Sequence, residues 1–458
     1  MAELAQPPNA FAERARRALG DAHLQGALDA GTRRLYEGRS AAWSALDDAE
    51  ELREQARRIR TETIADLDGY LATFSDAVER RGGHVTVCRT AEEANAYVVD
   101  VCHRLGARLA VKSKSMVSEE IALNAALESA GVTPVETDLG EYLLQLAGGH
   151  PAHIVAPAIE LTREEAARLL SEAEGARLDP ELTTLVSAAR RQLREAFLRA
   201  DVGISGANFG VAETGSICLV TNEGNGRLVT SLPRVHIALM GIERLVPTLA
   251  DLSVLLRLLS RSGTGQPLTV YTTLLTGPRR EGEQDGPEEL HVVVIDNGRS
   301  SLLGGRYEEM LNCIRCGACL NVCPVYRKSG GGAYGPVYSG PMGAVLVPLL
   351  AGLERAAALP HASSLCGACT AACPVKIPLH ELLLELRRDL VGNGVASRGE
   401  RVAFRLWSHA WSRPWAYRLS TRVARLGQRF ARLTRAGRAW AAGRELPRLA
   451  RRPYRDRS

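Results

Sequence analysis

The spacing of hydrophobic residues changes several times along this chain. Up to about residue 80, apolar side chains recur at helical spacing, as in ELREQARRIRTETIADLDGYLATFSDAVERRGG, and the pattern ends at Gly82 and Gly83. Short apolar runs then alternate with helical patterns. The predicted strands are HVTVC, RLAVKSKS, VTPVETD, HIVAPA, DVGISGANFG, SICLVTN, HIALMG, LTVYTTLL and ELHVVVID. This alternation predicts an α/β domain with a mostly parallel sheet over residues 81–305.

The pattern changes again at residue 306. Two short cysteine runs are embedded in helical pattern up to residue 398, with no convincing strand, and IPLHELLLELRRDLVGNG predicts an amphipathic helix. We therefore predict four parts. These are an N-terminal helical segment (1–80), the α/β domain (81–305), an all-α cysteine domain (306–398) and a basic C-terminal tail (399–458).

Composition places the chain among ordinary globular proteins. It has 458 residues, of which 45% are hydrophobic and 24% charged. No run of about 18 apolar residues is present, so no membrane-spanning helix is expected. The N-terminus lacks the apolar core of a secretory signal, which predicts a cytoplasmic protein.

Seven of the ten cysteines crowd into two short runs. In a reducing compartment, such crowding indicates a metal site rather than disulfides. The other three, Cys88, Cys102 and Cys218, lie in apolar stretches and are predicted to be buried core residues.

The first run, CIRCGACLNVCP, has the spacing C-x₂-C-x₂-C-x₃-C-P from Cys313 to Pro324. This spacing wraps thiolates around a [4Fe–4S] cluster, and its fourth cysteine ligates the other cluster in two-cluster ferredoxins. A zinc site would need a longer gap between two ligand pairs. The run therefore predicts an iron–sulfur cluster.

The second run, SSLCGACTAACP, has three cysteines, with Ser363 where the first run has Cys313. Cross-ligation predicts the following ligand sets: Cys313, Cys316, Cys319 and Cys373 for cluster 1, and Cys323, Cys366 and Cys369 for cluster 2. The fourth iron of cluster 2 then takes the Ser363 oxygen, another side chain such as His361, water or a partner's ligand. If that iron is absent, the cluster is [3Fe–4S].

Forty-two residues separate Cys323 from Cys366, which is long for a compact β-rich ferredoxin. This part resembles the helical ferredoxin modules of succinate dehydrogenase and heterodisulfide reductase relatives. The resemblance implies a role in electron transfer.

Two long stretches resemble the LUD domain of bacterial lactate-utilization proteins. They begin VKSKSMVSEEIALNAALESAG at Val111 and ADVGISGANFGVAETGSICLVTN at Ala200. Followed by the double cysteine motif, the chain resembles the lactate utilization protein B family over about residues 40–400. The resemblance implies a fold related to ribose-phosphate isomerases and coenzyme A transferases. It also implies an iron–sulfur protein that works with two partner proteins to oxidise L-lactate to pyruvate.

Several polar residues are candidate substrate ligands. The segment from Lys112 to Ser115 follows a predicted strand and precedes a helix, where basic and hydroxyl groups bind anions, although a solvated turn with an N-cap serine explains it equally well. TNEGNGRL has the composition of a hairpin turn, which does not explain the basic residues near it. The candidates are Lys112, Lys114, Glu213, Asn225, Arg227, Arg234 and His236. No dinucleotide-binding glycine fingerprint follows a strand.

The tail from Arg401 onward holds 16 arginines against two acids, Glu445 and Asp456, with interleaved tryptophans. We expect it first to dock on a protein partner and second to adhere peripherally to the anionic inner face of a membrane. Nothing else favours nucleic acid, so no specific nucleic-acid partner is expected.

The main hypothesis is an electron-transfer subunit that passes electrons from lactate through two clusters to an acceptor protein or the quinone pool. One alternative is the same role for another 2-hydroxy acid, such as glycolate. A second is a redox-sensing module that binds a small molecule.

Overall fold

The computed structural model describes residues 10–335, 337–395 and 398–431, and the single positions 434, 438 and 450. Residues 1–388 form one compact unit and residues 389–458 a second. Among the described residues, no helix is both long enough and apolar enough to cross a bilayer.

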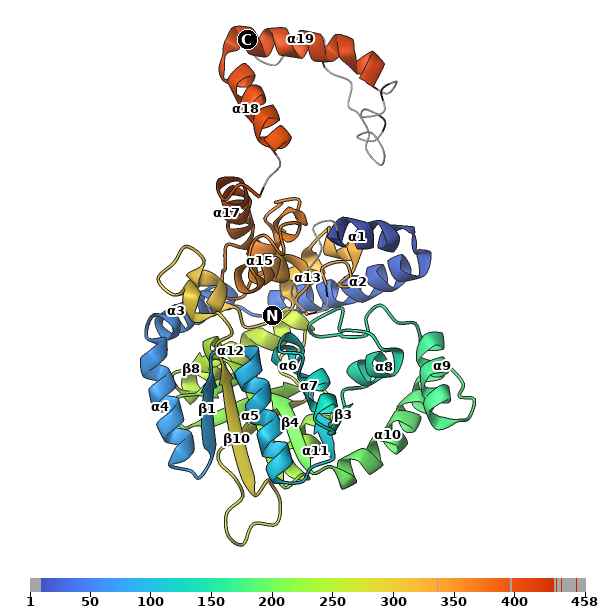
Figure 1. Cartoon of the computed structure of the whole chain (residues 1–458), viewed down its shortest axis with the longest axis vertical. Coiled ribbons are helices and arrows are strands. Elements are labelled where there is room, and N and C mark those ends of the chain that lie inside the picture. The colour runs from blue at the N-terminus through green and yellow to red at the C-terminus, as the bar shows by residue number, and fades with distance from the viewer. Residues whose placement is uncertain are drawn as a thin grey trace. The chain divides into compact units, whose positions relative to one another are not determined.

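A six-stranded sheet of parallel strands forms the centre of the first unit, in the order β1-β10-β7-β4-β2-β3 (Figure 1). Its strands are β1 (His84–Cys88), β2 (Leu109–Lys112), β3 (Thr133–Glu136), β4 (Val202–Gly206), β7 (Val235–Gly241) and β10 (Glu289–Ile295). The central strands are apolar along their whole length because both faces of the sheet are covered. The prediction of a mostly parallel sheet is confirmed.

One face of this sheet packs against α5 (Ala91–Arg104), α6 (Met116–Glu120) and α7 (Leu123–Ser129). Cys88 and Cys102 lie in this core, and Cys218 is buried elsewhere, as predicted.

The other face packs against α4 (Leu67–Glu79) and a smaller sheet of order β8-β5-β6-β9. The strands of the smaller sheet are β5 (Phe209–Val211), β6 (Ser216–Thr221), β8 (Leu245–Val246) and β9 (Tyr271–Leu275). The loop predicted at 277–289 connects β9 to β10.

Two local predictions are wrong. HIVAPA, predicted as a strand, forms turns, because the Nδ1 atom of His153 accepts the backbone N–H groups of Val155 and Ala156. The stretch 221–228, predicted as a hairpin turn, bends after Thr221 and continues from residue 225 as helix α11 (Asn225–Ser231). In both places a side-chain or helical hydrogen bond satisfies the backbone groups that a strand or hairpin would have paired.

The N-terminal segment is helical, as predicted, and consists of α1 (Ala10–Gly20), α2 (Ala22–Ser44), α3 (Ala49–Ala65) and α4 (Leu67–Glu79). Helices α1, α2 and α3 contact the cysteine-bearing segment (Figure 1). Four more helices lie outside the sheets: α8 (Leu139–Ala147), α9 (Arg163–Glu174), α10 (Leu182–Arg199) and α12 (Leu249–Gly263).

The helices of the cysteine domain are η3 (Glu308–Asn312), α13 (Ala318–Val322), α14 (Tyr326–Ser329), α15 (Gly340–Ala351), η4 (Leu359–His361) and α16 (Ala368–Ala372), of which α13 and α16 lie within the cysteine runs. Two further short helices, η1 (Ile242–Arg244) and η2 (Ser300–Leu302), precede this domain. The predicted amphipathic helix is α17 (Leu379–Gly392). The second unit contains α18 (Arg398–Ser412) and α19 (Pro414–Ala431).

Candidate functional site

The two cysteine runs have the same backbone conformation. Arg315 and Leu365, one residue before corresponding cysteines, have φ angles of 58° and 54°. Gly317 and Gly367 follow those cysteines with φ angles of 80° and 79°, a region that glycine enters without strain. Each run continues into a five-residue helix, α13 or α16, that ends before the last cysteine. The serine at position 363 therefore occupies the place that Cys313 has in the first run.

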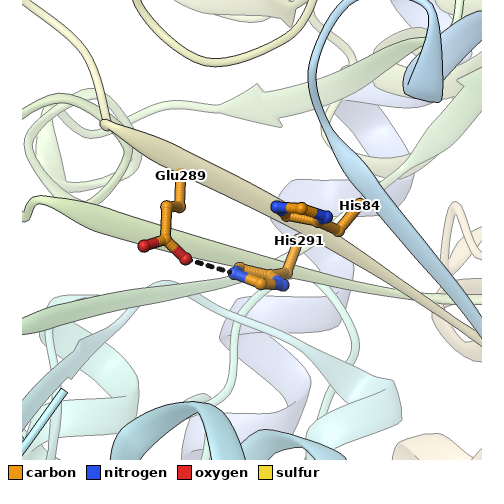
Figure 2. Close-up of side chains that lie close together, drawn as sticks. All are labelled: His84, Glu289 and His291. Carbon is orange, nitrogen blue, oxygen red and sulfur yellow. Dashed lines mark hydrogen bonds and ion pairs between the residues drawn. The ribbon is translucent and has the colours of Figure 1, made fainter. Parts of the chain in front are cut away.

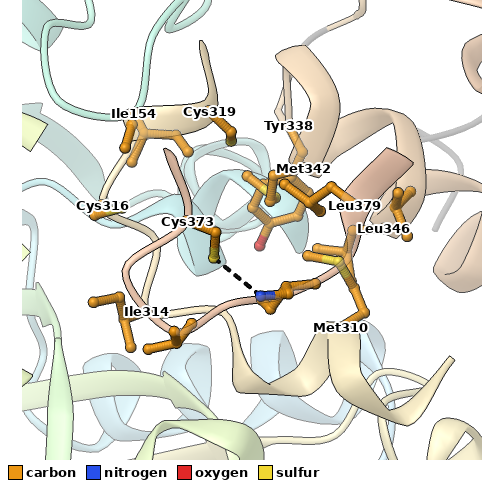
Figure 3. Close-up of a cluster of buried hydrophobic side chains, with 14 of the residues drawn as sticks. Ile154, Met310, Ile314, Cys316, Cys319, Tyr338, Met342, Leu346, Cys373 and Leu379 are labelled. Atoms are coloured by element: carbon orange, nitrogen blue, oxygen red, sulfur yellow. Dashed lines mark hydrogen bonds between the residues drawn. The ribbon is translucent and has the colours of Figure 1, made fainter. Parts of the chain in front are cut away.

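Cysteines far apart in sequence line one cavity. Its lining includes Cys313, Cys316, Cys319 and Cys373, with the apolar side chains of Ile154, Met342 and Leu379. Figure 3 shows Cys316, Cys319 and Cys373 among these apolar neighbours. The backbone N–H of Ile377 donates to the Cys373 sulfur at 3.4 Å. The structure thus brings together the four cysteines predicted for cluster 1.

Cys323, Cys366 and Cys369 are the cysteines predicted for cluster 2, and helices α13 and α16 of the two runs are in contact. Burial raises the pKa of Cys369 to about 11, and the charges of Cys323 and Cys366 add to the effect. The backbone N–H of Tyr326 donates to the Cys323 sulfur at 3.5 Å. Cys366 is exposed, whereas the other two are buried. A backbone N–H of Ala368 and the Ser364 hydroxyl lower the pKa of Cys366.

The donor chemistry of the first group fits an iron–sulfur cluster. All four thiols are free of disulfides. Burial and the nearby thiolates raise the pKa of Cys316 and of Cys373 to about 12, and that of Cys319 well above its usual value. Buried thiols that resist ionisation on their own become thiolates when a metal binds. Soft thiolate ligands are those that iron–sulfur clusters take.

The C-terminal end of the second run is held by two arginines that sequence analysis did not identify. Arg39 donates to the carbonyl of Ala372 at 3.1 Å, and Arg53 donates to that of Cys373 at 2.8 Å. The Ser363 hydroxyl accepts the backbone N–H of Leu365 at 3.1 Å. Helices α2 and α3 therefore fix the position of Cys373.

A buried charge network joins the first run to the carboxyl ends of strands β7 and β10. Arg299 donates to both oxygens of Glu120, at 2.8 and 2.6 Å, and its Nε lies 2.8 Å from Glu243 in an ion pair without the alignment of a hydrogen bond. Arg315, inside the cysteine run, lies 3.1 Å from Glu243. Arg244 donates to the carbonyl of Cys313 at 2.9 Å. The sequence shows Arg315 in the motif, but its partners are distant in sequence.

A second polar region lies at the carboxyl ends of β2 and β3. Lys112 is buried and its ammonium group binds Glu136 and Asn124. The Nζ atom of Lys114 is also buried but has no hydrogen-bond partner among the described atoms. Burial lowers the pKa of Lys114, while Asp138, Glu141 and Glu223 raise it.

The carboxylates near Lys114 are strongly perturbed. Burial and the charge of Glu136 raise the pKa of Glu141 well above its usual value. Burial and the charge of Asp138 raise the pKa of Glu223 to about 7. Parallel sheets bind ligands in this position, beyond the carboxyl ends of their strands. Of the predicted anion ligands, Lys114 alone presents an unpaired buried ammonium group here.

Glu223 and Asn225 also line an open cavity of about 900 Å³ beside α10. Asn225 donates to the Thr137 hydroxyl at 3.4 Å. The cavity wall adds Tyr271 and, from α10, the arginines 190, 191 and 194, none of which was a candidate from sequence.

The other four candidates lie in different environments. Glu213 accepts the N–H of Leu249 at the start of α12, which is a helix-capping contact. Arg227 is exposed over the Tyr271 ring. Arg234 is 78% exposed and pairs with Glu288. His236 is fully buried, and its Nε2 lies 2.9 Å from the Ser205 hydroxyl.

His84, Glu289 and His291 form a further cluster at the opposite edge of the sheet (Figure 2). Their ligand atoms lie within 4.8 Å of one another. The imidazole rings are stacked with an angle of 23°, so their in-plane lone pairs run side by side instead of converging on one ion. Glu289 is also paired with Arg104 at 3.0 Å. This cluster is therefore a weak metal site.

Comparison with known proteins agrees with these observations. The family model for the LUD domain matches residues 71–295, that for a 4Fe-4S dicluster domain matches 309–377, and that for the C-terminal part of lactate utilisation protein B matches 386–458. The chain therefore has an iron–sulfur dicluster domain after its α/β domain.

Curated relatives cover nearly the whole chain. Lactate utilization protein B of Bacillus pumilus is 50% identical over 91% of this chain and 88% of its own length. The protein of the same name from Bacillus thuringiensis is 46% identical over 97% of this chain and 96% of its own. A DUF162 family crystal structure from Deinococcus radiodurans is 16% identical, with a TM-score of 0.27, over 50% of this chain and 98% of its own. The family predicted from the sequence is confirmed: the chain belongs to the lactate utilization protein B family.

Proposed function

We propose that this chain is the iron–sulfur electron-transfer subunit of a complex that oxidises L-lactate to pyruvate, as the names of its relatives suggest. The observation that carries the proposal is the meeting of Cys373 with the first cysteine run in one apolar cavity. Lactate oxidation releases two electrons and two protons. An iron–sulfur cluster, when bound, accepts and passes on one electron at a time.

Cluster 1 is assigned to Cys313, Cys316, Cys319 and Cys373, as a [4Fe–4S] cluster. Cluster 2 is assigned to Cys323, Cys366 and Cys369, with the fourth position open to a hydroxyl oxygen or lacking its iron. Ser363 is supported by its equivalence to Cys313, and Ser364 is a second hydroxyl at the site because it hydrogen-bonds Cys366. The finer fold assignments are part of the same proposal: a helical ferredoxin and an isomerase- or coenzyme A transferase-like sheet.

The two groups of thiols differ in their access to solvent, which gives the electron path a direction. Cys316, Cys319 and Cys373 are buried, and arginines from the strand ends contact their run. Cys366 is exposed. We therefore place electron entry on the sheet side, at cluster 1, and exit through cluster 2 to an acceptor protein or a quinone, which takes up the two electrons and two protons. The two other lactate-utilization proteins complete the complex.

Lys114 is the residue of this chain best suited to bind a substrate carboxylate. Its buried Nζ lacks a hydrogen-bond partner among the described atoms. Glu223, with a pKa raised to about 7, is suited to exchange a proton at neutral pH. Lys112 is less suited because Glu136 already neutralises it.

The test is lactate-dependent reduction of a dye by the purified chain with its two partner proteins. Cys316→Ser should remove the signal, and Cys102→Ser, a buried thiol in the sheet core, should leave it intact. Lactate oxidation that survives Cys316→Ser would overturn the proposal. Faster turnover with glycolate than with lactate would keep the electron-transfer role and change the substrate.

A further inference from the structure

Helices α18 and α19 separate their basic and apolar residues onto different faces. In α19, Arg418, Arg422 and Arg425 recur at spacings of four and three residues, which places them along one side of the helix. Trp415, Leu419, Val423 and Leu426 recur at spacings of four, four and three residues along another side. Both helices appear in red in Figure 1.

Helix α18 has the same division. Arg401, Arg405 and His409 follow one another at intervals of four residues. The opposite arc carries Val402, Leu406, Trp407 and Trp411. Residues 398–431, which span both helices, contain eight arginines and one acidic residue, Glu400.

The apolar faces of both helices are exposed within the described chain. The large side chains concerned are Val402, Phe404, Leu406, Trp407, Trp411, Trp415, Leu419, Val423 and Leu426, each between 43% and 69% exposed. Within this unit, Trp411 contacts Trp407 and Tyr417, so the aromatic residues link the two helices. Exposed apolar residues that continue along two whole helices indicate a surface that is covered by something else.

We propose that α18 and α19 lie on the surface of an anionic lipid bilayer. The division into an arginine face and a face of tryptophan, phenylalanine and leucine is that of helices that lie in the membrane interface. Arginines that outnumber the acidic residues of these two helices by eight to one complement anionic headgroups. Neither helix is apolar enough to cross the bilayer. This inference goes beyond the proposed electron-transfer function and does not depend on the substrate.

The structure favours a bilayer over the protein partner expected first from sequence. Protein interfaces concentrate their apolar contacts in a central patch with few charges. Here the apolar residues extend over the whole length of both helices, with arginines parallel to them throughout.

The experiment measures co-sedimentation of the cluster-loaded full chain with vesicles. One set contains equal parts of phosphatidylglycerol and phosphatidylcholine, and the other phosphatidylcholine alone. We expect the chain to bind the anionic set at about 0.05 M salt and to be largely released at about 0.5 M salt, because salt screens the attraction. Absence of binding to the anionic set, or equal binding to both sets, would overturn the proposal.

Matched variants test the assigned residues. Arg405→Ala with Arg422→Ala should weaken partitioning to anionic vesicles about 25-fold, since each arginine near the surface contributes about fivefold. The control, Arg33→Ala with Arg168→Ala, removes the same charge from exposed helices of the first unit and should bind as the original chain does.

A second pair of variants tests the apolar face. Leu406→Ala with Leu426→Ala leaves the net charge unchanged, and alanine has a high helix propensity, so the helices should persist. This double variant should also bind anionic vesicles more weakly than the original chain. Binding that does not distinguish these variants from the control contradicts the assignment. If the variants lose binding to the partner proteins in lipid-free solution while no chain binds vesicles, the surface is a protein interface and the proposal fails.

Discussion

Arg299 is the residue whose removal should most disturb the junction between the sheet and the first cysteine run. Its side chain is fully buried between Glu120 and Glu243, both also buried. Replacement by methionine keeps the apolar stem but leaves two buried carboxylates without their shared counter-charge. Breaking a buried ion pair from one side costs about 3–5 kcal/mol.

The expected shift in melting temperature follows from the size of the unit. An unfolding entropy of about 2.1 cal/mol/K per residue over residues 1–388 gives about 0.8 kcal/mol/K. A loss of about 4 kcal/mol then lowers the melting temperature by about 5 °C. The assay is thermal unfolding of the cluster-loaded chain followed by circular dichroism.

The matched control is Arg168→Met, which breaks an ion pair with Glu172 whose members are both 62% exposed. Exposed pairs contribute about 0–1 kcal/mol, so this variant should melt within about 1 °C of the original chain. If Arg299→Met melts as high as the control, the network does not stabilise the fold and the reasoning is refuted.

The effect of Arg299→Met should depend on pH. Burial would raise the pKa of Glu243, but the charges of Arg299, Arg315 and Arg244 hold it at about 2, and the pKa of Glu120 is also below its usual value. These carboxylates stabilise the native chain above their unfolded pKa of 4.5, and that contribution is lost as pH falls from there toward 2. In the variant, burial without the Arg299 charge raises the pKa values of both carboxyl groups. They therefore become protonated at a higher pH than in the original chain, and protonation removes the cost of burying their negative charge. The difference in melting temperature should therefore be larger at about pH 8 than at about pH 5.5.

Three further predictions concern the cysteine runs. Cys373→Ser should alter the electron paramagnetic resonance signal of cluster 1 and leave that of cluster 2, whereas Cys366→Ser should do the reverse; both changes falling on one signal would contradict the cross-ligation. Ser363→Cys should supply a fourth thiolate to cluster 2. The electron paramagnetic resonance signal of a [3Fe–4S] cluster, or of a [4Fe–4S] cluster with one oxygen ligand, should then be replaced by that of an all-cysteine [4Fe–4S] cluster. An unchanged spectrum would exclude Ser363 from the ligand position. Gly317→Ala should lower the free energy of unfolding by about 1–2 kcal/mol because the residue has a positive φ, and by more because the added Cβ would lie 3.3 Å from neighbouring side-chain atoms. Gly367→Ala has the same positive φ but no atom within 4 Å of the added Cβ, so only the first contribution is expected. Thermal unfolding of both variants measures the difference.

The sequence predicts best those features that depend on local spacing. The strands β7 and β10 are continuous apolar runs bounded by turns, and the structure has them where predicted. The cysteine spacing predicted that Cys373 would meet the first run, and the two sit around one cavity. In each case residues a few positions apart carry the information.

The sequence fails where distant residues decide the local structure. His153 lies in an apolar run that resembles a strand, but its Nε2 bonds Asn321 at 3.0 Å, next to the cysteines, and its Nδ1 closes a turn. Lys112 and Lys114 are alike in sequence, yet only Lys112 has a carboxylate partner within hydrogen-bond reach. Such pairings depend on the packing of α6, α8 and the strand ends, which no local pattern encodes.

The charges at the junction explain why this α/β sheet and this cysteine domain form one unit. Within the described network, the buried arginines Arg60, Arg244 and Arg299 and the partly buried Arg315 outnumber the buried glutamates Glu120 and Glu243. Burial lowers the pKa of Arg60 to about 9 and that of Arg244 to about 10, although the charge of Glu243 acts to raise both. Buried charge is stable only when it is paired. A group of four thiolates around iron is anionic. Arg315 lies inside the run that carries three of them, and Arg244 donates to the carbonyl of Cys313 in the same run. Under the proposed assignment of cluster 1 to Cys313, Cys316, Cys319 and Cys373, the arginines at the strand ends would supply part of its counter-charge, and the LUD sheet would be part of its electrostatic environment.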